Sequence, residues 1–131
     1  MSSDDIPDRV FAFLAEAIET VPQLEALLLL WDTHRPWSAD ELAARIYVQA
    51  ETAAAILQAL QRRRLLREVE GAVPIRYEYD SGWDPSGERI AEIARAYRQH
   101  VVRLATFIHA GASSSVREFA RAFELKKGSD S

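Results

Sequence analysis

The 131-residue sequence contains no cysteine and no asparagine. The absence of cysteine excludes disulfide bonds, thiolate metal sites and cysteine nucleophiles, and it suits a reducing compartment. Only five glycines are present, and they form neither a glycine-rich phosphate loop nor a GxSxG turn. The three histidines, His34, His100 and His109, are not spaced as metal ligands. These absences predict a protein that is not an enzyme and that uses no metal or other cofactor.

Long apolar runs and an excess of positive charge are also missing. The most apolar stretch, Leu27 to Trp31, is too short to cross a bilayer, and the first residues lack the basic charge of a signal peptide. We therefore expect a cytoplasmic protein without a membrane partner. The sequence has 16 basic and 20 acidic residues, which excludes nucleic-acid binding by bulk positive charge alone. The basic residues nevertheless gather from Arg62 onward, which indicates a more positive face.

Apolar residues recur at helical spacing in the first half of the chain and predict four helices there. Ser38 and Glu41 have the spacing of a capping box, which marks the start of the third helix. The second helix has almost no polar face, so we expect it to lie at the centre of the domain. These four helices are expected at residues 7–21, 22–32, 39–46 and 51–63.

The second half predicts a β-hairpin and then more helix. Residues 65–70 and 75–79 have the character of two short strands, and the turn residues 71–74 separate them. Asp84 and Pro85 are typical of a helix start, and we expect one long helix from residue 85 to residue 109. A second capping box, Ser115 with Glu118, predicts a last helix that carries Phe119 and Phe123 on one face.

The long helix carries an apolar stripe with steps of four, three, four, three and four residues, which is a heptad pattern. Such a stripe is buried either against the chain's own first helix or against a second copy of the chain, and we predict a homodimer. Either Val101→Glu or Leu104→Glu is then expected to break the dimer while leaving helix content intact. The predicted dimer or partner interface consists of Ile90, Ala94, Tyr97, Val101, Leu104, Ile108, Phe119 and Phe123.

The order helix, helix, turn, helix and hairpin resembles a winged helix-turn-helix. The residues that carry the resemblance are Ser38 to Leu66 and the hairpin Leu65 to Tyr79, which look like the DNA-binding core of MarR-type bacterial regulators. The ending Val116 to Lys127 also resembles that of a group of small bacterial winged-helix proteins. We therefore expect one domain, residues 1–131, that is mainly α with a small two-stranded β wing. A winged-helix core at 1–83 would be followed by C-terminal helices at 84–131.

The resemblance implies a double-stranded DNA site on the fourth helix and the hairpin. Bases or phosphates would be contacted by Gln49, Thr52 and Gln58. Phosphates would be contacted by Arg62, Arg63, Arg67 and Arg76. Binding is expected to be weak, because Ala54 and Ala55 stand where such regulators usually offer polar side chains.

Two residues at the ends of the fourth helix and a set of aromatic residues keep other functions open. Glu51 puts negative charge near the start of the fourth helix, and Arg64 stands where the family pattern prefers glycine. The first alternative is therefore a winged helix that binds a protein partner and no DNA. The second is a ligand-sensing module whose pocket is lined by aromatic side chains. Those aromatic residues are Trp31, Trp37, Tyr77, Tyr79, Trp83 and Tyr97.

Overall fold

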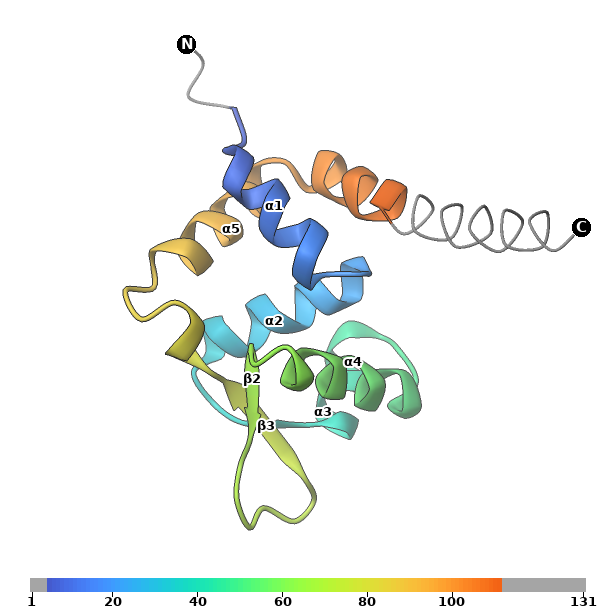
Figure 1. Ribbon diagram of the computed structural model, residues 1–131. Helices are drawn as coiled ribbons and strands as arrows, with labels where there is room; N and C mark the ends of the chain where they lie inside the picture. The colour runs from blue at the N-terminus through green and yellow to red at the C-terminus, as the bar shows by residue number, and fades with distance from the viewer. Residues whose placement is uncertain (1–4, 112–131) are drawn as a thin grey trace, which may run out of the picture.

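The computed structural model describes residues 5–111, which form a group of packed helices with a small sheet at one side (Figure 1). The helices of the first half are α1 (Asp8–Ala17), α2 (Val21–Thr33), α3 (Ala39–Ile46) and α4 (Ala50–Arg62). The strands are β1 (Trp37–Ser38), β2 (Leu66–Glu68) and β3 (Arg76–Tyr79). A short 3-10 turn, η1 (Ser81–Trp83), leads to α5 (Glu88–Gln99), and residues 101–111 are helical again.

The predicted start of α3 is confirmed in its hydrogen bonds. The Ser38 hydroxyl accepts from the backbone N–H of Glu41 at 3.2 Å, and the Ser38 N–H donates to the Glu41 carboxylate at 2.9 Å. These two bonds satisfy backbone donors that a helix start otherwise leaves unpaired. The helix ends at Tyr47, which adopts a left-handed conformation with φ of 60°. This turn sets the angle between α3 and α4.

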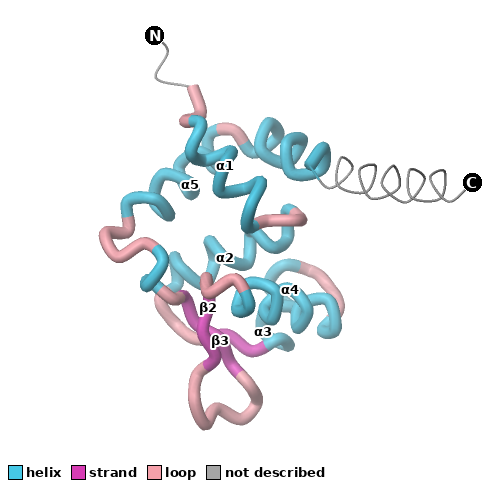
Figure 2. The backbone as a smooth tube through the Cα atoms, in the orientation of Figure 1, coloured by secondary structure: helices cyan, strands magenta, loops and turns pink. Residues whose placement is uncertain are grey.

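The sheet has one strand more than the predicted hairpin. β3 lies in the middle and pairs antiparallel with β2 on one side and β1 on the other. β1 has only two residues, Trp37 and Ser38, and so gives no alternating pattern that a sequence could reveal. Figure 2 shows the β2–β3 hairpin projecting beyond the helices as a wing. The fold is mainly α with a small β wing, a winged helix-turn-helix.

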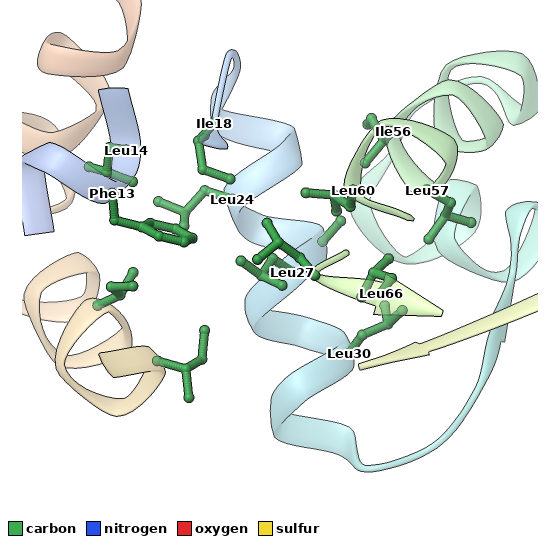
Figure 3. Packing of buried hydrophobic residues seen from close by; sticks show 14 of the residues in the cluster. Phe13, Leu14, Ile18, Leu24, Leu27, Leu30, Ile56, Leu57, Leu60 and Leu66 are labelled. Atoms are coloured by element: carbon green, nitrogen blue, oxygen red, sulfur yellow. The ribbon is translucent and has the colours of Figure 1, made fainter. Parts of the chain in front are cut away.

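The helix α2 lies at the centre of the core, as its composition predicts. Leu24, Leu27 and Leu30 have no exposed surface. Figure 3 shows the side chains of α2 between those of α1 and those of α4 and β2, so one helix joins the two halves of the core. Each fully buried leucine stabilises the fold by about 1.5–3 kcal/mol relative to exposure.

The prediction of one long helix from residue 85 to residue 109 is wrong. Asp84 does not begin the helix, because α5 starts at Glu88 after Gly87 in a left-handed conformation. The helix ends at Gln99, and His100 leaves helical geometry with φ of −136° and ψ of 47°. A straight helix of that length would extend about 36 Å, slightly more than the roughly 30 Å diameter of a small domain. The break allows the next helix to fold back, and Phe107 packs against Phe11 with 4.9 Å between the ring centres.

The predicted apolar stripe therefore does not form one continuous face. Four of its residues, Ile90, Ala94, Leu104 and Ile108, are at most 5% exposed in the single chain. Their side chains pack inside this chain and leave no surface for a second copy. Leu104→Glu is consequently expected to disrupt folding and not dimers alone.

The other residues of the predicted dimer interface differ from these four. Tyr97 is half-buried and donates a hydrogen bond to Glu25 at 3.3 Å, while Val101 is 46% exposed. Phe119, Phe123 and the predicted last helix lie outside the described residues.

Candidate nucleic-acid interface

The helix α4 separates its apolar and polar residues onto two faces. Ala53, Ile56 and Leu57 are buried against the core. The outer face carries side chains at steps of four, three and four residues, and all are exposed. This outer row consists of Glu51, Ala55, Gln58 and Arg62. The apolar side of α4 therefore holds the helix on the core. Its opposite side is exposed and can contact a ligand.

The predicted base-contacting residues are all accessible. Gln49 is the residue before α4, where its side chain makes no capping hydrogen bond. Thr52 is exposed on the first turn of α4, and Gln58 is exposed in the outer row. Gln58 also lines a cleft of about 200 Å³ between α4 and the wing, together with Asp40 and Ile75. The three polar residues thus lie along the same helix, but an acidic residue shares the cleft with Gln58.

Three of the four predicted phosphate-contacting arginines have carboxylate partners within the chain. Arg76 donates to Glu41 at 2.8 Å, and Arg63 donates to Glu19. Arg67 lies 3.6 Å from Glu78 on the neighbouring strand. Their positive charge is therefore partly compensated before any ligand arrives.

The charge on Glu41 is held by several donors at once. Its pKa is lowered mainly by the hydrogen bond from the Ser38 backbone, with further contributions from Arg76 and Arg35, and partial burial opposes the shift. Arg35 lies 3.6 Å from the same carboxylate and stacks 3.8 Å from the centre of the Trp37 ring. Glu41 thus joins α3 to the wing and to the loop before β1.

Arg62 and Arg64 differ from the other arginines of this surface. Both are exposed, and neither takes part in an ion pair within residues 5–111. Arg64 has a φ of 63°, the left-handed region that favours glycine, which agrees with the glycine expected there from the family pattern. These two side chains are the free positive charges at the end of α4.

Sequence reasoning missed the carboxylate partners of the arginines. Arg63 and Glu19 are 44 residues apart, and Arg76 and Glu41 are 35 apart. No local spacing connects residues at such separations. It also missed Tyr47, which is 92% exposed at the turn before α4.

A larger cleft, of about 410 Å³, lies on another side of the molecule between α2, the end of α3 and α5. Leu28, Leu29 and Ile46 form part of its apolar wall. Burial, and then the neighbouring Glu25, raise the pKa of Tyr97 in this cleft to about 12. The raised pKa keeps the Tyr97 hydroxyl protonated to well above the pH at which an exposed tyrosine ionises.

The predicted aromatic pocket is not assembled. Of its six residues, only Trp31 and Tyr97 line the cleft between α2 and α5. Trp37 and Tyr77 are opposite each other in the sheet, and Trp83 stacks on Phe13 at 5.1 Å. The aromatic side chains mainly fill the core and the sheet.

Metal and membrane features are absent from the described chain. Residues 5–111 contain no group of three histidine or acidic side chains arranged to hold a metal ion. No helix of the same part is both long and apolar enough to span a membrane.

A likeness to a known protein is found at the level of structure. No family model matches the chain, and no curated protein does. A MarR family protein from Bacillus stearothermophilus has a similar solved structure, with a TM-score of 0.49 and 21% sequence identity. The alignment covers 95% of this chain and 84% of that one. The winged helix-turn-helix assignment rests on the chain's own helix order and on its three-stranded sheet.

Proposed function

We propose that this chain is a winged-helix protein of the transcription-regulator type that binds double-stranded DNA weakly, through phosphates more than through bases. The observation that carries the proposal is the exposed outer row of α4, which ends in Arg62. A helix of this kind fits the major groove, and an unpaired arginine at its end can neutralise a phosphate. The protein would act in the cytoplasm by binding alone, without catalysis or a cofactor.

Base recognition is expected to be limited. Gln49 and Gln58 can each pair with an adenine edge, and Thr52 can reach a phosphate. Ala54 and Ala55, which lie between Thr52 and Gln58, offer only methyl groups to a base. The wing would add Arg67 and Arg76, but each must first leave a carboxylate or share it. Affinity should therefore depend more on salt than on sequence.

The test is fluorescence anisotropy of a labelled pool of duplexes, titrated with the protein at two salt concentrations. We expect Arg62→Ala to weaken binding at low salt and to lower the slope of log affinity against log salt by about one. Arg76→Ala should have a smaller effect because Arg76 is paired with Glu41. Arg95→Ala, which removes an exposed arginine from α5, is the matched control. Equal effects of Arg62→Ala and Arg95→Ala would contradict the proposal.

A second candidate function is a protein-binding winged helix that does not bind DNA. Residues 38–80, which hold α3, α4 and the wing, contain seven carboxylates and six arginines. A surface with this balance repels DNA as much as it attracts it, whereas it suits a protein with both charges. This function predicts that the folded protein binds no duplex at low salt.

A further inference from the structure

Three residues other than glycine have a left-handed backbone in the described part of the chain. They are His34 with φ of 52°, Tyr47 with φ of 60° and Arg64 with φ of 63°. They lie at the ends of α2, α3 and α4, in that order. A Cβ atom strains this conformation, and so helix ends of this kind commonly carry glycine.

The ends of α3 and α4 have the hydrogen bonds that usually accompany such a glycine. At the end of α3, the Val48 N–H donates to the Ala43 carbonyl at 3.1 Å. At the end of α4, the Leu65 N–H donates to the Leu60 carbonyl at 3.0 Å. Both are closures of the Schellman type, in which the left-handed residue is usually glycine. The tyrosine and the arginine at these two positions therefore cost stability where glycine would not.

The fold makes little use of either side chain. Tyr47 is 92% exposed. Arg64 is also exposed, and it takes part in no ion pair within residues 5–111. Backbone strain that the packing of the chain does not require is common at functional sites. The strain at these two residues therefore points to a contact outside the chain.

The two residues flank α4, the helix that the proposed function places in the major groove. Tyr47 lies three residues before its start and Arg64 two residues after its end. A helix of 13 residues is about 20 Å long, whereas the major groove of DNA is about 12 Å wide. When α4 lies across the groove, a residue beyond either end faces a phosphate backbone and not the bases. His34 flanks neither end of α4.

We propose that Tyr47 and Arg64 bind the DNA backbone at the two ends of α4 and so hold this helix in the groove. The Tyr47 hydroxyl donates a hydrogen bond to one phosphate, and the Arg64 guanidinium neutralises another. This inference rests on the proposed function and adds two positioning residues to it. The strain that both residues place on the backbone is then the cost of two contacts with the ligand.

The test compares stability with DNA affinity in the same variants. Glycine relieves the strain, so Tyr47→Gly and Arg64→Gly should each raise the midpoint of thermal unfolding by about 2–5 °C. Each should nevertheless weaken duplex binding at low salt by about tenfold. Arg64→Gly should also lower the slope of log affinity against log salt by about one. Tyr47→Gly should leave that slope unchanged, because a phenol neutralises no phosphate.

His34→Gly is the matched control, because it relieves the same strain at an exposed residue that does not flank α4. It should raise the unfolding midpoint as the other two variants do and leave duplex binding unchanged. Tyr47→Phe keeps the ring and the strain but removes the hydroxyl. It should lose affinity without gaining stability.

Arg62→Ala separates a failure of this inference from a failure of the proposed function. Suppose that the wild type binds duplex DNA and that Arg62→Ala weakens the binding. Wild-type affinity in Tyr47→Gly, Tyr47→Phe or Arg64→Gly would then overturn this inference alone, and so would an equal loss of affinity in His34→Gly. A folded wild type that binds no duplex at low salt would overturn the proposed function and this inference together.

Discussion

Glu41 is the residue at which helix start, sheet and loop meet. Its carboxylate accepts from the Ser38 backbone and from Arg76, and Arg35 lies close by. The capping part of this role follows from the Ser38–Glu41 spacing, which is local. The ion pair with Arg76 does not, because it depends on how the wing folds back to the start of α3. One side chain thus combines a contact that a sequence can reveal with one that it cannot.

The lowered pKa of Glu41 gives a prediction on acid stability. Because the folded state holds the carboxylate ionised, its contribution to the free energy of unfolding is present above the ordinary glutamate pKa. The contribution is lost as the pH falls from about 4.3 through the lowered value. We expect Glu41→Gln, which keeps an acceptor oxygen for Ser38, to lose less stability than the wild type between about pH 6 and about pH 3. Urea unfolding at several pH values measures this, with the exposed Glu16→Gln as control. Parallel curves for the wild type and Glu41→Gln would show that the charge contributes nothing.

The buried Asp84 is expected to stabilise the start of α5. It is 4% exposed, and its carboxylate accepts from the Ile90 N–H in the first turn of α5 at 2.9 Å. The residue thus caps the helix from outside, although it does not begin it. We expect Asp84→Ala to lower the free energy of unfolding by about 1–3 kcal/mol, because a buried donor loses its partner. Asp84→Asn should cost less. Asp80→Ala is the control, because it removes a more exposed carboxylate that accepts from the Gly82 N–H. Equal losses in Asp84→Ala and Asp80→Ala would contradict the buried cap.

The predicted helices and strands agree with the structure where local rules decide, and they differ where packing decides. The bounds of α3 are as predicted, because a capping box fixes the start of this helix. The bounds of α1, α2 and α4 differ from the prediction by a few residues at most. The prediction of one long helix failed because two shorter helices that pack on one core also satisfy the heptad spacing. The site shows the same division: the exposed row of α4 follows from helical periodicity, but the carboxylate partners of its arginines do not.

The break at His100 gives a prediction that separates the two helix arrangements. In one straight helix, Val101 and Leu104 would share a buried stripe and lose similar stability on truncation. In the structure Leu104 is fully buried and Val101 is 46% exposed. We therefore expect Leu104→Ala to lower the free energy of unfolding by about 2–5 kcal/mol and Val101→Ala by less than about 0.5 kcal/mol. Denaturant unfolding at a dilution that keeps the chain monomeric measures both. Losses of similar size would support the straight helix.

Under the proposed function, the charge of the whole molecule limits the affinity for DNA. The net charge is −4, and Glu41 of α3 and Glu78 of the wing pair with arginines that would contact phosphates. The fold offers the shape of a DNA-binding surface, while the charges reduce its attraction. Removal of carboxylates near α4 and the wing should therefore raise the affinity of this surface for DNA.

We expect the double variant Glu51→Gln with Glu78→Gln to bind duplex DNA about fivefold more tightly than the wild type at low salt, which corresponds to about 1 kcal/mol. Glu51 lies on the outer row of α4, and Glu78 pairs with Arg67, so their loss relieves repulsion and frees a cation. The control is Glu16→Gln with Glu88→Gln, which changes the net charge equally at exposed positions on α1 and α5. Anisotropy titrations at two salt concentrations distinguish the outcomes. A gain in the first variant alone places the contact at α4 and the wing. Equal gains in both variants would attribute the gain in affinity to net charge alone. No gain in either variant would favour the protein-binding function.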